Sequence, residues 1–359
     1  MYRNRCLTAV IIIFLVSRLV SASLSERDLV QPVDTSTVYV SKILDGTVVV
    51  IDVSTDEIIA ILRTGSNPAE VAIVDALDRA YVADLTDGTV TVIDTTDHSI
   101  EETIAVGHPV ASAAVDQFVQ RVYALDFSNG TPGTNLHEID AETNIEIADV
   151  TIGSRLQNIA VDPYGSRAYA TDFVDGVIII DTSSLSVVTN LPVSNLPHGI
   201  AVHPDLNRLY VTQLDSDTVT VIDITTHAVV DTLSVGDTPQ WIGVDLIRNK
   251  AFVTNEGDGT VSVIDLSTNT VGPSTIPVGA DPLTVTIHEP AAKAYVYNLG
   301  DGTISVIDTI NETVIATIDV LFADGFESGD TTRWSNTVPS ASVPGTELRS
   351  YDKLSAGDS

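Results

Sequence analysis

Cysteine is almost absent from this chain of 359 residues, which contains only Cys6. Cys6 falls within a predicted signal peptide, so we expect the exported protein to have no thiol. This excludes a disulfide scaffold, a cysteine-ligated metal and a cysteine nucleophile. Basic residues are also scarce, with 17 Lys and Arg against 49 Asp and Glu and a formal net charge of −32. A field of that sign repels phosphate backbones, so nucleic acid is excluded as a partner.

The sequence also lacks an apolar run of transmembrane length. The run Leu7–Val16 is about ten residues long, which is too short to cross a bilayer. Arg3 and Arg5 precede it, and the small-residue sequence ending at Ala22 follows it. This order is typical of a signal peptide over residues 1–22. We therefore expect a secreted, periplasmic or cell-surface protein that does not span the membrane.

Aromatic residues make up only 5% of the chain, yet most of them recur at a regular interval. Seven apolar segments begin with an aromatic residue, at Tyr39, Tyr81, Tyr123, Tyr169, Tyr210, Phe252 and Tyr295. A second series of runs ends in aspartate with the same period, at Asp52, Asp94, Asp140, Asp181, Asp223, Asp265 and Asp308. Two series in register indicate seven units of about 42 residues.

Each unit is predicted to form four antiparallel strands. In the fifth unit the first two strands are expected at 199–202 and from Tyr210, and the last at 228–233. Five units carry Asp-Gly between the second and third strands, the pair that suits tight hairpins. Third strands such as 48–51 are apolar on both faces, so both faces must be covered. We predict an all-β fold, a seven-bladed β-propeller of four-stranded antiparallel blades, in preference to an open solenoid.

The motifs Tyr-Val-Thr-Gln at 210–213 and Phe-Val-Thr-Asn at 252–255 resemble the YVTN-type β-propeller repeat family of exported bacterial and archaeal proteins. The resemblance covers about residues 36–320. It implies the propeller fold but no single activity, because relatives of this wider group include cell-surface proteins, lactonases and quinoprotein dehydrogenases. The segment 324–335, with Asp-Gly-Phe-Glu-Ser-Gly-Asp and a later Trp-Ser, resembles a C-terminal tail of exported bacterial proteins.

Four regions follow from these patterns. We expect a signal peptide at 1–22, an N-terminal segment at 23–35, the propeller at 36–320 and a partly disordered tail at 321–359. The first unit lacks a clear innermost strand, which either the N-terminal segment or the chain after the last unit could supply. The third unit has a longer hairpin at 128–134, and such loops often carry function.

The conspicuous polar residues are assigned to architecture. The seven strand-end aspartates recur once per unit, with Thr or Ser close behind most of them, so we expect them to close turns by accepting hydrogen bonds from backbone amides. The seven histidines show no metal-binding spacing, and no nucleophile elbow or phosphate loop is present. We therefore predict no catalytic residue and no metal ligand, and the sequence identifies no cofactor.

The units differ most where the innermost strand begins, at the predicted mouth of the central channel. We predict a low-molecular-weight ligand or glycan site there, formed by Glu70, Gln157, Asn158, His198, Gln240 and Trp241. The alternative is that these six channel-mouth residues only fill and hydrate the channel.

Three functions remain open on this evidence. We place first a secreted, monomeric binding or interaction module whose partner is a small molecule, a glycan or a protein. The second is an enzyme at the channel mouth, a lactonase-like hydrolase or a quinoprotein-dehydrogenase-like protein, with Glu70 and His198 as acid and base. The third is a surface-layer spacer.

Overall fold

The computed structural model describes residues 36–127, 134–193 and 195–320. The predicted signal peptide, the segment 23–35, residues 128–133 of the longer hairpin and the tail 321–359 lie outside the described residues. The expectations placed on them stay predictions.

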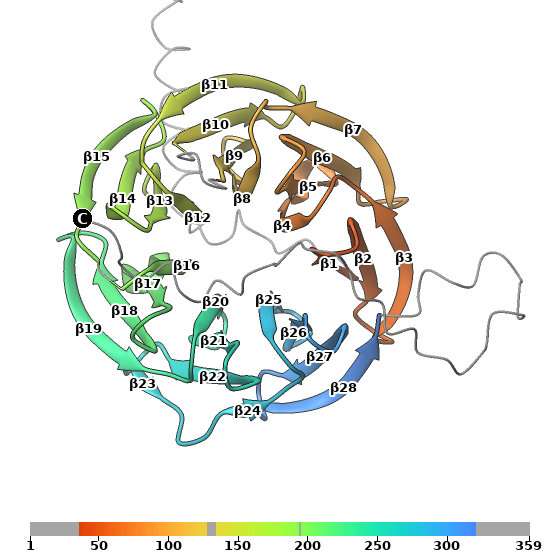
Figure 1. Cartoon of the computed structure of the whole chain (residues 1–359), viewed down its shortest axis with the longest axis vertical. Coiled ribbons are helices and arrows are strands. Elements are labelled where there is room, and N and C mark those ends of the chain that lie inside the picture. The colour runs from red at the N-terminus through yellow and green to blue at the C-terminus, as the bar shows by residue number, and fades with distance from the viewer. Residues whose placement is uncertain (1–35, 128–133, 194, 321–359) are drawn as a thin grey trace, which may run out of the picture. The chain divides into compact units, whose positions relative to one another are not determined.

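The described strands form seven antiparallel sheets arranged as blades around one axis (Figure 1). Blade 1 contains β1 (Thr37–Lys42), β2 (Thr47–Asp52) and β3 (Glu57–Arg63); blade 2 contains β4 (Pro68–Val74), β5 (Arg79–Asp84), β6 (Thr89–Asp94) and β7 (Ser99–Ala105). Blade 3 contains β8 (Val110–Asp116), β9 (Arg121–Asp126), β10 (Asn135–Asp140) and β11 (Ile145–Thr151); blade 4 contains β12 (Leu156–Asp162), β13 (Arg167–Asp172), β14 (Gly176–Asp181) and β15 (Ser186–Leu191).

The remaining blades follow the same order from the centre outward. Blade 5 contains β16 (Pro197–His203), β17 (Arg208–Gln213), β18 (Thr218–Asp223) and β19 (Ala228–Ser234). Blade 6 contains β20 (Pro239–Asp245), β21 (Lys250–Asn255), β22 (Thr260–Asp265) and an outer strand divided into β23 (Thr270–Val271) and β24 (Ile276–Pro277); blade 7 contains β25 (Pro282–His288), β26 (Lys293–Asn298), β27 (Thr303–Asp308) and β28 (Thr313–Asp319).

The predicted seven-bladed β-propeller is therefore confirmed. Blade 1 has three strands among the described residues. The outer strand of blade 6 is interrupted at Gly272 and Pro273, where proline has no N–H for the sheet. The only helical segments in the described part are two short 3-10 turns, η2 (Asp75–Leu77) and η3 (Pro204–Leu206). Within that part, no helix has the length and apolarity needed to cross a bilayer.

The hydrophobic core lies between neighbouring blades. One cluster joins Tyr210 and Val221 of blade 5 to Ile242 and Val253 of blade 6, and each of the other joints has a similar cluster. Residues 48–51 of β2 are fully buried, as their apolar character on both faces predicts. The regular stacking of blades thus supplies the cover that the third strands require.

In blades 2, 5 and 7 the aromatic residue of the repeat also connects blades through its hydroxyl. Tyr81 donates to the carbonyl oxygen of Asn144's side chain in blade 3 at 2.7 Å, and Tyr210 to that of Asn269 in blade 6 at 3.2 Å. Tyr295 of blade 7 makes the same contact with Asp56 of blade 1, at 2.8 Å. Blade 7 therefore joins blade 1 by the same hydrogen bond that links other blades. Lys293 strengthens this joint through an ion pair with Asp56 at 2.7 Å.

The threonine of the Tyr-Val-Thr-Asn motif makes a second connection. Thr171, Thr212 and Thr254 donate to backbone carbonyl oxygens of the following innermost strands, at His198, Gln240 and Leu283, over 2.7, 3.1 and 3.0 Å. The same hydroxyls accept from the amides of Asn158, Gly199 and Trp241 in their own blades. In blades 4, 5 and 6 the motif threonine thus fixes the start of the innermost strand.

The turn roles predicted for the strand-end aspartates are confirmed. Each accepts from backbone amides two or three positions later, as Asp223 does from Thr225 at 3.0 Å and Thr226 at 2.9 Å. These bonds and that of the Thr226 hydroxyl hold the pKa of Asp223 below its usual value. The hairpin glycines adopt positive φ as predicted; a Cβ on Gly176 (φ 87°) would lie 2.1 Å from the Leu191 carbonyl oxygen.

Candidate functional site

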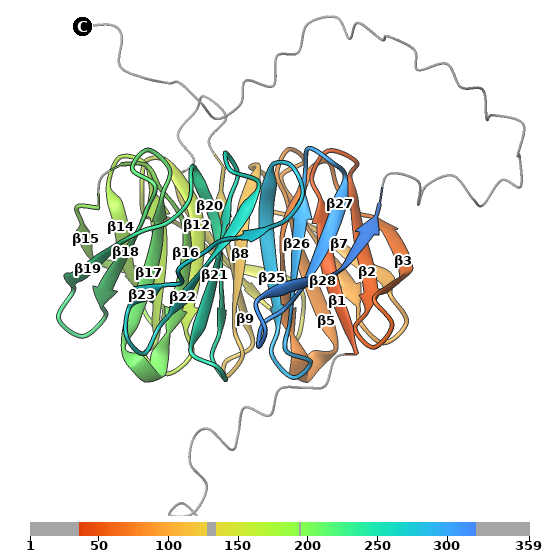
Figure 2. The same ribbon diagram turned by 90° about the horizontal axis from the view of Figure 1, so that it is seen from below.

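The innermost strands of blades 2 to 7 begin on one face of the ring, which we call the upper face because it lies at the top of Figure 2. Near their starts these strands depart from regular pairing; in β16, for example, the register shifts between Pro197 and Ile200. The channel-mouth residues occupy this irregular stretch. Bulges of this kind change the direction in which side chains point. The positions that differ most between the units are therefore also those at which the backbone leaves the regular sheet.

Glu70 of β4 faces blade 3. Its carboxylate accepts a short hydrogen bond from the Ser112 hydroxyl and a second from the Ala113 amide at 3.3 Å. Ser112 in turn accepts from the Ile159 amide of blade 4 at 3.2 Å. Burial raises the pKa of Glu70 to about 7, against the lowering effect of its two hydrogen bonds. Glu70 therefore belongs to a hydrogen-bonded joint across blades 2, 3 and 4.

Gln157 and Asn158 of β12 are buried. The Gln157 amide donates to the Arg155 carbonyl oxygen at 3.1 Å. The side-chain oxygen of Asn158 is buried without a hydrogen-bond partner among the described residues. A buried acceptor of this kind is costly unless water or a ligand satisfies it.

His198, Gln240 and Trp241 form a group in blades 5 and 6, and Phe173 of blade 4 extends it. The ring centroid of His198 lies 5.9 Å from that of Trp241, edge to face, and 6.3 Å from that of Phe173. The Gln240 side chain donates a short hydrogen bond to Glu256. We call Phe173, His198, Gln240 and Trp241 the upper-face cluster.

The tautomer of His198 follows from its partner. Nδ1 lies 3.1 Å from the Gln240 carbonyl oxygen, which can only accept, so Nδ1 carries the proton. Burial lowers the pKa of His198, which keeps the imidazole neutral and leaves Nε2 as an acceptor. No hydrogen bond within the described residues occupies Nε2 of His198 or Nε1 of Trp241. The cluster thus combines flat rings with one acceptor and one donor.

The structure brings together only part of the predicted site. His198, Gln240 and Trp241 are in contact, whereas Glu70 bonds to blade 3 and makes no hydrogen bond with His198. An acid and base pair of Glu70 and His198 therefore has no support in the described geometry. Sequence reasoning missed Phe173 and Arg155, whose guanidinium lies 5.3 Å from the Phe173 ring centroid. Both sit in loops of blade 4 beside the innermost strands.

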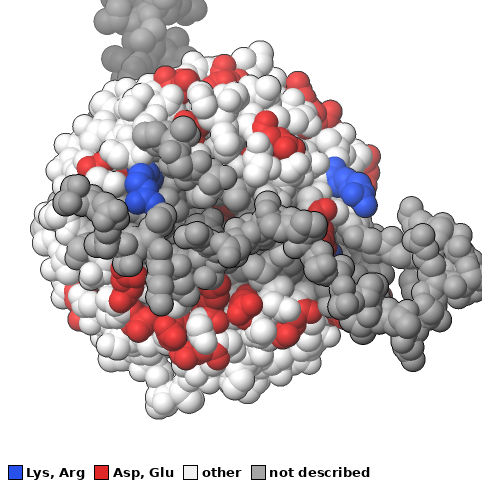
Figure 3. All heavy atoms as spheres, in the orientation of Figure 1, with Lys and Arg blue, Asp and Glu red and all other residues white. Residues whose placement is uncertain are grey.

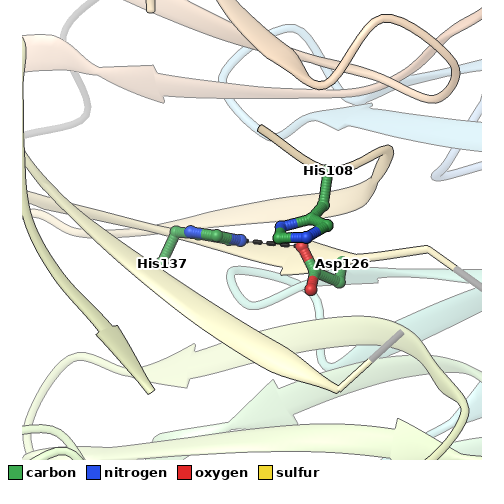
Figure 4. Close-up of side chains that lie close together, drawn as sticks. All are labelled: His108, Asp126 and His137. Carbon is green, nitrogen blue, oxygen red and sulfur yellow. Dashed lines mark hydrogen bonds and ion pairs between the residues drawn. The ribbon is translucent and has the colours of Figure 1, made fainter. Parts of the chain in front are cut away.

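A second polar group lies on the upper side of blade 3. Potential ligand atoms of His108, Asp126 and His137 all lie within 4.8 Å of one another (Figure 4). His137 Nε2 bonds to Asp126 at 2.7 Å, and Nδ1 bonds to Glu146 at 2.7 Å. Burial lowers the pKa of His137, but the bonds to the two carboxylates outweigh it and raise that pKa above its usual value. These residues could hold a metal ion, although no sequence spacing predicted it.

Basic residues at the lower face are paired with acidic groups. In blades 2 to 7 an arginine or lysine begins the second strand there, as Arg208 pairs with Asp223 at 2.5 Å and Arg121 with Asp140 at 2.8 Å. The face shown in Figure 3 has many more acidic than basic side chains in view.

No protein-family model matches the sequence, and no curated protein matches it. The YVTN-type family thus stays a prediction. A solved structure of hydrazine synthase from Kuenenia stuttgartiensis is similar with a TM-score of 0.68 and 16% sequence identity, over 76% of this chain and 92% of that one. The dihydro-heme d1 dehydrogenase NirN in complex with DHE has a TM-score of 0.61 and 17% identity, over 83% of this chain and 66% of that one. A protein of unknown function from Desulfotomaculum acetoxidans has a TM-score of 0.66 and 15% identity, over 78% of this chain and 94% of that one. At these identities the similarity shows the fold alone.

Proposed function

We propose that this chain is an exported, non-catalytic binding protein whose ligand contacts the upper-face cluster, and that the ligand is a neutral glycan. The half-buried rings of His198 and Trp241, set edge to face at the start of two innermost strands, are the observation that supports it most. Aromatic faces beside hydrogen-bonding groups suit sugars, which present both C–H faces and hydroxyls.

The positions of these residues within the repeat support a special role. Other blades have Ala69, Ala111 or Leu283 where blade 5 has His198, and Gly199 leaves room for Trp241. A Cβ on Gly199 would lie 2.6 Å from the Gln240 carbonyl oxygen and 3.0 Å from the Trp241 Cα. The cluster therefore departs from the repeat at adjoining positions.

Electrostatics disfavours an anionic ligand. His198 is neutral, Glu256 is bonded to Gln240, and the chain as a whole carries a net charge of −32. An anionic ligand would be repelled by that field. The enzyme alternative gains no catalytic set from the described residues, because Glu70 and His198 have separate partners.

The test is a glycan array probed with the full chain, expressed with its leader and recovered from the extracytoplasmic fraction. The best ligand is then titrated by calorimetry. Trp241→Ala removes a ring from the site and is expected to weaken binding about tenfold or more. Phe118→Ala is the matched control, because Phe118 forms a similar exposed ring pair with Tyr164, at 6.0 Å, on the lower face.

Equal losses in both variants, or no binding to any glycan, would overturn the glycan proposal. If the chain instead bound a protein or a non-sugar small molecule, and Trp241→Ala abolished that binding, the site would stand and the ligand class would change. Recovery of the protein only from the cytoplasm would contradict export.

A further inference from the structure

Blade 3 departs from blades 2, 5, 6 and 7 at two positions that meet in space. In blade 2 the last residue of the second strand, Asp84, accepts from the Thr91 hydroxyl at 2.7 Å. Blades 5, 6 and 7 likewise pair the equivalent residue with a hydroxyl, at Thr220, Ser262 and Ser305. In blade 3 the equivalent hydroxyl position is His137.

His108 is the second departure. It lies in the turn between β7 and β8, where other blades have Ser66, Ser154, Asp237 or Ala280. Its ring stacks on that of His137, with centroids 6.4 Å apart and planes inclined by 30°. Figure 4 shows the two rings close together, with Asp126 beside them. Two imidazoles thus replace small side chains at the two positions that converge on one carboxylate.

The hydrogen bonds of His137 fit the arrangement of a metal ligand. Glu146 accepts from Nδ1, which orients the ring and leaves Nε2 pointing at Asp126. Metal-binding histidines usually have such a carboxylate behind the ring. An ion bound at Nε2 would replace the proton that now joins His137 to Asp126.

His108 supplies the remaining ligand. It is exposed, while Asp126 and His137 are buried, so the site would open toward solvent through His108. No hydrogen bond to the His108 ring is made by the described residues, and its nitrogen is free to bind an ion. Two imidazoles and one carboxylate, with further positions for water, are a donor set suited to Zn²⁺ and similar divalent ions.

We propose that His108, Asp126 and His137 form a divalent transition-metal site on blade 3, with Glu146 as the residue that positions His137. The site is separate from the upper-face cluster and does not depend on a glycan ligand.

The test is calorimetric titration of the chelator-treated full chain with Zn²⁺, with Co²⁺ absorption as a spectroscopic readout. We expect one ion per chain. His108→Ala is the decisive variant, because an exposed residue can be removed without disturbing the core, and it should weaken binding about tenfold or more. His227→Ala, at a turn of blade 5, is the control for unspecific histidine binding and should leave affinity unchanged.

Glu146→Gln checks the positioning role. It should weaken binding about tenfold and alter the Co²⁺ spectrum, while the ion count stays at one. Equal affinity of wild type and His108→Ala would overturn the proposal. Asp149→Asn weakening binding more than His108→Ala would also overturn it, because the ion would then lie on the Nδ1 side of His137, where Asp149 is 3.9 Å away.

Discussion

In blades 4, 5 and 6 a threonine of the second strand bonds the next innermost strand, whereas blades 2 and 3 have Ala83 and Leu125 at that position. Their polar contacts lie elsewhere: Glu70 of blade 2 bonds Ser112 of blade 3, and Asp126 bonds His137 within blade 3. The threonine contacts use neutral hydroxyls, and these two contacts use buried ionisable groups. The contribution of a buried ionisable group to the free energy of unfolding depends on its partner and on pH, whereas that of a neutral hydroxyl does not depend on pH.

The largest expected effect is a difference in stability between substitutions of Asp126 and Asp84, which occupy equivalent positions in neighbouring blades. Asp126→Asn removes one partner of the buried pair with His137 and should lower the free energy of unfolding by about 3 kcal/mol. Asp84→Asn should change it by less than about 1 kcal/mol, because blades 6 and 7 already pair asparagine with hydroxyls there and burial raises the pKa of Asp84. Urea unfolding of metal-free protein at neutral pH measures both.

Equal losses in the two variants would contradict this contrast. They would mean that the carboxylate acts alike in both blades and that the imidazole of blade 3 adds nothing to the stability of this contact.

The second effect concerns the Glu70 joint and depends on pH. The folded-state pKa of Glu70, about 7, lies above its ordinary value, so the charged group destabilises the fold as pH rises between the two values. Glu70→Gln keeps an acceptor for Ser112 and Ala113 but cannot ionise. The variant should match wild type near pH 4 and exceed it by up to about 3 kcal/mol at pH 8.

The measurement is the difference in unfolding free energy between Glu70→Gln and wild type across that pH range. A difference that stays constant with pH would contradict the raised pKa. Thr232→Val, on the exposed outer strand β19, removes no ionisable group and is a control that should show no such rise.

The sequence was sufficient for the fold because each unit repeats the same physical requirements. The period of the aromatic residues, the Asp-Gly hairpins and the strand-end aspartates each report one local constraint, and all seven units repeat nearly the same set. The joint between blades 7 and 1 could not be foreseen. It depends on Tyr295 and Lys293 meeting Asp56, more than two hundred residues away in the chain.

The candidate sites were only partly predictable, for a related reason. His198, Gln240 and Trp241 stand out because they break the repeat in successive units. His108 and His137 break it too, but they are 29 positions apart and have no metal-binding spacing. A comparison of equivalent positions would have identified both histidines, whereas their convergence on Asp126 needs the register of β9 and β10. Phe173 was missed because most units have an apolar residue at that place.

The smallest effect tests a regular joint. Thr212→Val keeps the shape of a fully buried side chain but removes the hydroxyl that bonds Gly199 and Gln240. Two buried backbone groups then lose a partner, so the unfolding free energy should fall by about 2 kcal/mol without dependence on pH. Thr232→Val, on the exposed outer strand β19, is the control and should change it by less than about 0.5 kcal/mol. If Thr212→Val were as harmless as the control, the absence of a hydroxyl at Ala83 and Leu125 would need no compensation, and the contact of Glu70 with Ser112 would have to serve something other than cohesion of the ring.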